Sequence, residues 1–311
     1  MDLIRLQQNL RPLTSGGYQP SLLESRYFSE YALDLEKQLP DVRHNFGYID
    51  SHNYRIACHL YLKKPAQGSV FILHGYFDHS GYFNHVIRFF LEKNYNVFIY
   101  DLPGHGLSTG KPASIPDFSM YSQILEDLQN YCRNSLLKPW CGFGQSTGSA
   151  ILTDFLMEKV SHNQPVPFEK LILSAPLVRP KLWHINRLQL CVMKFFTRQI
   201  PRKFTNNSRD KAFLRKAHND PLSAKMLSIE WLLAMDRWIR RIESSRHIIP
   251  LTTVIIQGTH DGTVDGKYNI PKLQQIYQNT QVLWLENARH HLPNEIEETR
   301  RQYFSWLNTY L

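Results

Sequence analysis

A single serine stands between two glycines in the segment GFGQSTGSA, residues 142–150. Ser146 follows a short apolar run and precedes a run with helical spacing, so we expect it at a sharp turn from a strand into a helix. Gly144 and Gly148 leave the space that such a turn needs. The first turn of a helix presents free N–H groups that favour negative charge nearby. The segment therefore predicts a nucleophilic serine.

A phosphate-binding loop is the alternative explanation of a glycine-rich turn. The pattern GxGxxG would need a glycine at position 147, which is Thr147, and no Gly-Lys-Ser or Gly-Lys-Thr follows. Both nucleotide-binding motifs are therefore excluded for this segment.

A serine hydroxyl becomes an effective nucleophile when a base takes its proton and an acid orients that base. Asp261 follows the strand-like run TTVIIQG (252–258), and His290 follows the strand-like run QVLWLEN (281–287). The carboxyl ends of parallel strands meet at one edge of a sheet, where catalytic groups collect. We therefore expect Ser146, Asp261 and His290 to form a catalytic triad, in an order that known triads use.

A second acid and a second histidine lie close to these two. Asp265 stands before an expected helix, which it could cap, so a structural role is favoured for it. His291 is followed by an apolar residue and a helix that begins with proline, which favours packing or capping.

A serine nucleophile also requires two N–H groups to bind the oxyanion of the tetrahedral intermediate. One is expected from the backbone of Thr147, directly after the nucleophile. The other is expected from Tyr76, because Gly75 lets the loop after the strand-like run SVFILH (69–74) approach the serine.

The elements that must position these residues alternate between strand-like and helix-like runs, which predicts an α/β fold with a mostly parallel central sheet covered by helices on both faces. The expected strands are residues 54–62, 69–74, 96–101, 139–144, 170–176, 252–258 and 281–287, and the expected helices are residues 26–39, 81–95, 118–132, 147–160, 267–278 and 294–310.

A basic insert interrupts this alternation. Residues 179–250 contain 16 Lys and Arg against 5 Asp and Glu, whereas the whole chain has a formal charge of +9, so the rest is slightly acidic. We expect four parts, namely an N-terminal arm (1–45), a first core part (46–178), the insert (179–250) and a second core part (251–311). No nucleic-acid-binding motif accompanies the charge, so nucleic acid is not an expected partner.

Five segments together resemble the α/β-hydrolases of the monoacylglycerol lipase group, which includes bacterial lysophospholipases and belongs with the serine aminopeptidase S33-like hydrolases. They are HGYFDHSGYF (74–83), YDLPGHGLSTG (100–110), GFGQSTG (142–148), QGTHDGTVD (257–265) and ARHHLPNE (288–295). The resemblance covers residues 45–311 and implies the same triad and the same oxyanion residues. It also implies that residues 179–250 form a cap over the site and that neither metal nor organic cofactor is needed.

The resemblance implies a single-chain lipid ester as substrate. The cationic cap would suit a phosphate head group, so a lysophospholipid is the first expectation, and a monoacylglycerol or simple carboxylic ester is the second. An aminopeptidase is disfavoured because HGYFDH lacks the HGGPG loop. The contrasting class is a lipid-binding relative without catalysis, which typically lacks a triad residue.

Residues 184–198 are expected to form a basic amphipathic helix, with His184, Arg187, Lys194 and Arg198 on one face. Such a helix is either an ordinary cap helix with a solvated cationic face or a contact to an anionic membrane.

The start of the chain lacks an apolar signal-type core, and the cysteines lack metal-binding spacing. These features predict a cytoplasmic protein with possible peripheral contact at the inner membrane face.

Overall fold

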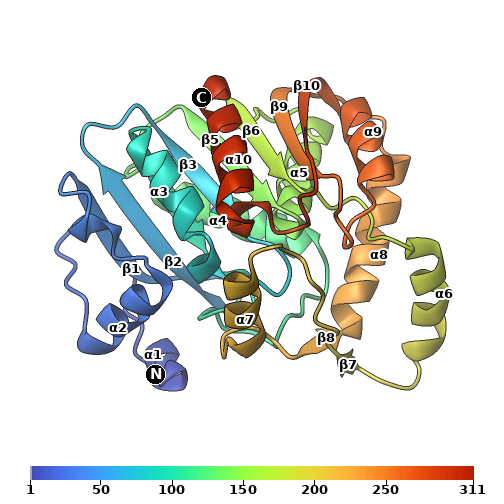
Figure 1. Cartoon of the computed structure of the whole chain (residues 1–311), viewed down its shortest axis with the longest axis horizontal. Helices are drawn as coiled ribbons and strands as arrows, with labels where there is room; N and C mark the ends of the chain where they lie inside the picture. The colour runs from blue at the N-terminus through green and yellow to red at the C-terminus, as the bar shows by residue number, and fades with distance from the viewer. Residues whose placement is uncertain (1) are drawn as a thin grey trace.

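The computed structural model describes residues 2–311, and in this range an eight-stranded sheet runs in the order β1-β2-β4-β3-β5-β6-β9-β10 (Figure 1). β1 and β2 form an antiparallel hairpin, and β2 pairs antiparallel with β4, whereas all other neighbours are parallel. The strands are β1 Val42–Ser51, β2 Tyr54–Lys63, β3 Gly68–Leu73, β4 Tyr95–Tyr100, β5 Trp140–Gln145, β6 Lys170–Ser174, β9 Ile249–Gly258 and β10 Tyr277–Leu285. The predicted α/β-hydrolase fold is therefore confirmed.

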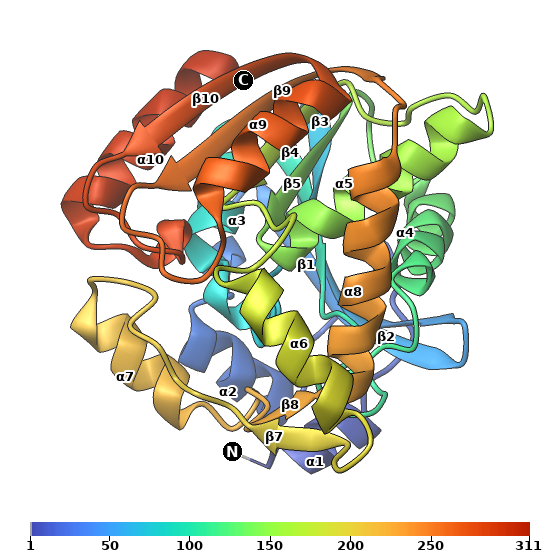
Figure 2. The ribbon, with the colours of Figure 1, turned by 90° about the vertical axis from the view of Figure 1, so that its right-hand side faces the viewer.

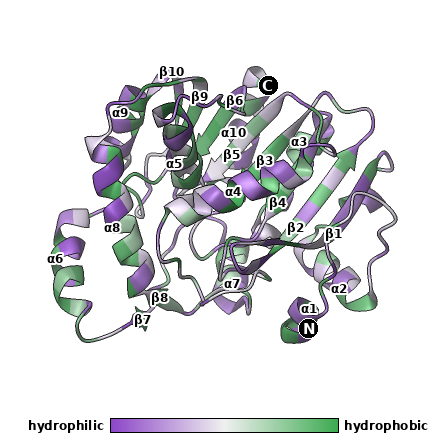
Figure 3. Ribbon diagram, turned by 180° about the vertical axis from the view of Figure 1, so that it is seen from behind, coloured by the Kyte–Doolittle hydropathy of each residue, from purple (hydrophilic) through white to green (hydrophobic). Residues whose placement is uncertain are grey.

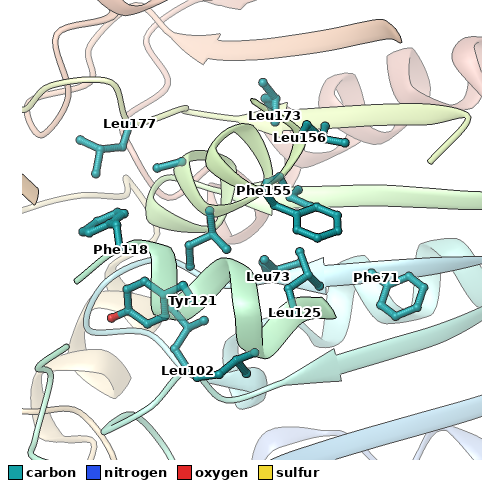
Figure 4. Close-up of a cluster of buried hydrophobic side chains, with 14 of the residues drawn as sticks. Phe71, Leu73, Leu102, Phe118, Tyr121, Leu125, Phe155, Leu156, Leu173 and Leu177 are labelled. Carbon is teal, nitrogen blue, oxygen red and sulfur yellow. The ribbon is translucent and has the colours of Figure 1, made fainter. Parts of the chain in front are cut away.

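Alternate side chains of the central strands pack into two separate cores, one on each face of the sheet. In β3, Phe71 and Leu73 belong to one core, and Val70 and Ile72 belong to the other. Figure 4 shows part of the first core, where Leu125 and Phe155 lie beside side chains of β3. Burial on both faces explains why these strands read as continuous apolar runs.

Helices on both faces complete the two cores. The first core receives apolar side chains from α4 (Ser119–Cys132), α5 (Thr147–Ser161) and α9 (Gly266–Ile276). The second receives them from α3 (Asn84–Glu92) and α10 (Glu297–Tyr310).

The N-terminal arm contains α1 (Leu3–Gln8), α2 (Leu22–Tyr31) and a short 3₁₀ turn at Leu35–Lys37. The helix expected over 26–39 is wrong in its bounds, because Ser21 and Glu24 form a capping box and Ala32 ends the helix in a left-handed conformation. The first strand, β1, had no predicted counterpart.

The insert folds over one end of the sheet as α6 (Trp183–Met193), β7 (Gln199–Pro201), α7 (Lys211–Asn219), β8 (Met226–Ser228) and α8 (Ile229–Ser244) (Figure 2). β7 and β8 pair antiparallel, which holds the segment after α6 beside the segment before α8. The amphipathic helix expected over 184–198 is shorter, since α6 ends at Met193 and Arg198 precedes β7. Its apolar residues Ile185, Leu188 and Val192 face solvent.

Candidate active site

The turn that carries Ser146 joins β5 to α5. Ser146 has φ 53° and ψ −110°, a conformation that costs free energy and is typical of functional turns. Both flanking glycines are required sterically, since a Cβ on Gly148 would lie 2.1 Å from the Leu73 carbonyl oxygen and one on Gly144 would lie 2.5 Å from the Ser149 nitrogen. The expected strand, turn and helix are therefore present, and the serine projects from the end of the central strand.

The three residues expected to form the triad lie within hydrogen-bonding distance. His290 Nε2 lies 3.0 Å from Ser146 Oγ, and His290 Nδ1 lies 2.8 Å from Asp261 Oδ2. Because Asp261 accepts at Nδ1, the neutral ring carries its proton there and presents Nε2 as the acceptor for the serine hydroxyl. Gln145 Nε2 donates to the His290 carbonyl oxygen at 2.9 Å and fixes the histidine loop against the serine turn.

Asp261 is buried just after the end of β9, and both of its carboxylate oxygens accept hydrogen bonds. Oδ1 accepts the N–H groups of Thr263 at 2.7 Å and Val264 at 3.1 Å, and Oδ2 also accepts Gln257 Nε2 at 2.9 Å. These donors stabilise the ionised form and set the direction in which the carboxylate faces His290.

In both Asp261 and His290, charge pairing and hydrogen bonding together shift the pKa more than burial does. Burial would raise the pKa of Asp261, but the charge and hydrogen bond of His290 hold that pKa below its usual value. Burial would lower the pKa of His290, but the charge of Asp261 and its hydrogen bond raise it above the ordinary value. An ionised acid beside a strengthened base is the arrangement that general-base chemistry requires.

The neighbouring acid and histidine lie elsewhere. Asp265 stands at the start of α9 but makes no side-chain cap, and its carboxylate instead accepts Arg179 Nη2 at 2.9 Å. His291 points to Asp78, with Nε2 3.3 Å from Oδ2, and its backbone N–H donates to Asn207 at 2.7 Å. No hydrogen bond joins either residue to Ser146 within residues 2–311.

The two expected oxyanion donors lie on either side of the serine turn. A Cβ on Gly75 would lie 3.4 Å from Ser146 Cβ, so the loop that carries Tyr76 passes close to the nucleophile. In the described part of the chain, the N–H groups of Tyr76 and Thr147 donate to no other backbone group. The Tyr76 side chain is fixed by stacking on Trp231 of α8, with ring centroids 3.7 Å apart, and by its hydroxyl donating to Ala113 at 2.7 Å.

A cavity of about 670 Å³ lies between the serine turn and the insert. One part of its lining is apolar and comes mostly from the insert, and it includes Trp183, Leu190, Met193, Leu227, Ile229, Leu232 and Met235. The other part is polar and includes Asp78, Arg202, Lys203, Asn206, Asn207, His218 and His291. We call the apolar set of lining residues the apolar lobe, which suits an acyl chain, and the polar set the polar lobe, which suits a hydrophilic group.

Sequence reasoning gave no role to several residues that position the site. Gln145 is the last residue of β5 and Gln257 the second-last residue of β9. Both lie close in sequence to a predicted triad residue, which could have suggested hydrogen bonds to the triad. Arg202 and Asp220 come from the insert, and their partners are remote in sequence, so no local pattern marks them.

Within residues 2–311 no group of three or more His, Cys, Asp or Glu side chains is arranged to hold a metal ion. The expectation that no cofactor is needed stays a prediction. In the same range, no helix has both the length and the apolar content needed to span a bilayer.

The fold, the strained serine turn and the aligned histidine and aspartate define a serine hydrolase of the α/β-hydrolase class. The sequence model of the family described as serine aminopeptidase, S33, matches residues 64–297, most of the chain. The chain therefore belongs to this family, and the resemblance found in its motifs is confirmed.

Similar proteins include ones named monoglyceride lipase. The chain is 23% identical over 252 residues to human monoglyceride lipase, covering 78% of this chain and 81% of the relative. It is 26% identical over 254 residues to an uncharacterized abhydrolase domain-containing protein of Dictyostelium discoideum, but covers only 26% of that protein. A soluble variant of the monoglyceride lipase of Saccharomyces cerevisiae, solved with a substrate analog, has a TM-score of 0.72 at 16% identity and covers 85% of this chain and 93% of its own. At that identity the structural likeness shows the fold.

Proposed function

We propose that the chain hydrolyses the ester bond of single-chain lipids, with monoacylglycerols as the first substrate class. The observation that carries this proposal is the hydrogen-bonded series Ser146, His290 and Asp261 at the floor of a cavity with one apolar lobe. The similarity to a human protein named monoglyceride lipase favours monoacylglycerol over the lysophospholipid that the cap charge suggested.

The proposed mechanism is acyl transfer through a covalent intermediate. His290 Nε2 accepts the proton of Ser146 Oγ as that oxygen attacks the ester carbonyl, while the N–H groups of Tyr76 and Thr147 bind the oxyanion. His290 then gives the proton to the departing glycerol oxygen, which leaves an acyl-enzyme. Water, deprotonated by His290, attacks the acyl-enzyme and releases the fatty acid.

The direct test is the rate of fatty-acid release from a panel of monoacylglycerols, lysophospholipids and short carboxylic esters. The proposal expects the largest kcat/KM for monoacylglycerols. Preference for short esters would support a general carboxylesterase, and reaction of the serine without turnover of any ester would support a lipid-binding protein. Lysophospholipid is the second candidate, favoured by Arg202 and Lys203 in the lining of the polar lobe.

The activity is expected to rise with pH along an acid limb whose midpoint lies above the ordinary histidine value of about 6.5. The reason is that His290 must be neutral to act as base, and its pKa is raised, so protonation persists to higher pH. The charge of Asp78 contributes to that rise, so Asp78→Asn should move the midpoint of kcat/KM downward. Asp210→Asn, on the partly exposed start of α7, is the control and should leave it in place. A midpoint that is equal in all three proteins contradicts the effect of Asp78 on His290, and a wild-type rate without an acid limb contradicts the assignment of His290 as base.

We further propose that α6 attaches the cap to an anionic bilayer. Six large apolar side chains on or beside this helix are between 57% and 83% exposed, namely Leu182, Ile185, Leu188, Val192, Phe195 and Phe196. The opposite side of α6 lines the cavity through Trp183, Asn186, Leu190 and Met193. Figure 3 shows apolar residues, in green, along α6 at the outer edge of the molecule. Exposed apolar clusters of this kind mark interaction sites.

Charge next to the apolar residues favours an anionic surface. Lys194 directly follows α6, and Arg198 directly precedes β7. Neither side chain pairs with an acid within the described range 2–311. A basic residue near an anionic leaflet contributes on the order of 1 kcal/mol to binding. The helix thus lies between the bilayer and the cavity that would receive its lipid.

Replacing Phe195 and Phe196 together by serine is expected to weaken binding to vesicles of phosphatidylcholine and phosphatidylglycerol by at least about 100-fold, since each buried phenylalanine contributes about 1.5–3 kcal/mol. Partition is measured by vesicle sedimentation. The matched control is Ile4→Ser with Leu22→Ser, which removes two equally exposed side chains from the N-terminal arm at the other end of the molecule (Figure 1). Equal loss in both double variants, or no binding by the wild type, contradicts attachment through α6.

A further inference from the structure

Arg202 is a partly buried cation in the polar lobe of the cavity. It follows β7, and its backbone N–H donates to the Lys225 carbonyl at 2.9 Å, which extends the hairpin of β7 and β8 and fixes the residue at the cavity wall. The guanidinium carbon lies over two aromatic rings, 4.2 Å from the centroid of Phe77 and 4.4 Å from that of Phe204. Two cation–π contacts hold the guanidinium in place without using its N–H groups as hydrogen-bond donors.

The charge of Arg202 is not neutralised by a carboxylate. Its one side-chain hydrogen bond in the described residues is a long one, from Nη1 to the Ala224 carbonyl at 3.4 Å. No ion pair involves its guanidinium anywhere in residues 2–311. Asp78 is the acid that influences it most, and that carboxylate already pairs with His291. A partly buried guanidinium with unused donors is costly without a partner, and an anionic ligand would supply that partner.

The position of Arg202 indicates that it would contact the alcohol part of the ester and not the acyl chain. Phe77, on which it stacks, directly follows Tyr76, the proposed oxyanion donor. The apolar lobe is built from α6, α8 and β8 and fits the acyl chain, which leaves the polar lobe for the alcohol part of the ester. Arg202 and Lys203 are cations in that lobe, and Asp78 is the one acid in the lining that the described residues provide.

We propose that Arg202 is a specificity residue that binds a phosphate carried by the alcohol part of the substrate, so that the enzyme accepts acylglycerol phosphates besides neutral monoacylglycerols. The proposal rests on the ester hydrolysis proposed above and adds the chemistry of the head group. A guanidinium edge matches two phosphate oxygens at once. A quaternary ammonium head group fits less well, because it needs an open aromatic cage and the Phe77 and Phe204 rings are already covered by Arg202.

The experiment compares kcat/KM for 1-decanoylglycerol and 1-decanoylglycerol 3-phosphate, both below their aggregation limits, for wild type, Arg202→Gln and Arg202→Lys. The glutamine variant is expected to lose about 30-fold on the phosphate substrate and less than about 3-fold on the neutral one, as a charged hydrogen bond is worth about 1.5–3 kcal/mol. The lysine variant should retain part of the preference, since it keeps the charge without the planar fork. Arg215→Gln, an exposed arginine on α7, removes the same charge from the insert and should change neither value.

The outcomes distinguish failure of the proposed role of Arg202 from failure of the proposed ester hydrolysis. Equal losses on both substrates would mean that Arg202 only supports the fold of the cavity, and would overturn the specificity role. Turnover of decanoylglycerol with none of its phosphate by wild type would also overturn it, while leaving the ester hydrolase intact. If neither ester is turned over by folded protein, the proposed function itself fails.

Discussion

Ser146→Ala is expected to lower kcat for monoacylglycerol hydrolysis by about 10⁴-fold to 10⁶-fold, the usual loss when the nucleophile of a triad is removed. The hydroxyl is the only part of the residue that the variant removes, and it lies 3.0 Å from His290 Nε2. The strained backbone of the turn is kept by Gly144 and Gly148, so the folded state should persist. Activity is followed by fatty-acid release, and folding by circular dichroism and thermal unfolding.

The matched control for this variant is Ser149→Ala on the same turn. Its hydroxyl is buried and donates to the Gly144 carbonyl at 2.6 Å, but it does not touch His290. Its loss should cost about 1 kcal/mol of stability and only a few-fold in activity. Two alanine variants with similar losses would show that the turn needs its hydrogen bonds rather than a nucleophile at position 146.

Asp220→Ala is expected to lower the free energy of unfolding by about 3–5 kcal/mol, because it removes one member of a buried charged network. The Asp220 carboxylate, on the insert, accepts the Tyr31 hydroxyl of the arm at 3.0 Å and His79 Nε2 of the core at 3.2 Å. Ser223, three residues later, donates to the Phe77 carbonyl at 3.3 Å. This short segment therefore joins the insert to the arm and to the loop that carries the proposed oxyanion donor.

The acid dependence of stability gives a second measurement on Asp220. Burial would raise the pKa of its carboxyl, but the hydrogen bond and charge of His79 lower it to about 2. A lowered folded pKa stabilises the protein fully above the unfolded value of about 3.9 and loses that contribution as pH falls toward 2. The difference in stability between wild type and Asp220→Asn should therefore shrink between about pH 4 and pH 2. Asp210→Ala, which removes the N-cap of α7, serves as the control and should cost about 1 kcal/mol. An Asp220→Ala protein as stable as this control would contradict the linking role.

The sequence predicted the sheet and the triad residues because both depend on local patterns. Apolar runs in β3, β5 and β9 are buried on both faces and stand out without alignment. Ser146 follows β5, Asp261 follows the end of β9 and His290 follows the end of the more exposed β10, so their shared edge could be inferred from strand direction alone. The hydrogen bonds among them could not be inferred, because they depend on loop conformation.

The insert was predicted less well because tertiary contacts override its helical pattern. The pattern of 184–198 predicted a basic face with the apolar residues mostly elsewhere, and α6 has apolar side chains on two sides, one lining the cavity and one in solvent. Arg187 was assigned to a free cationic face, yet its Nε lies 2.9 Å from Asp236 of α8. The strand β1 was missed because the polar residues His44 and Asn45 interrupt its apolar residues, although both side chains are buried.

Covalent labelling by a fluorophosphonate, followed by peptide mass mapping, tests the central claim most directly. The arrangement of Ser146 beside His290 and two free N–H groups predicts one adduct per chain, on Ser146, with labelling slowed strongly in His290→Ala and absent in Ser146→Ala. Folded wild-type protein that remains unlabelled, or that carries the adduct on another residue, would contradict the assignment of this site as the catalytic centre.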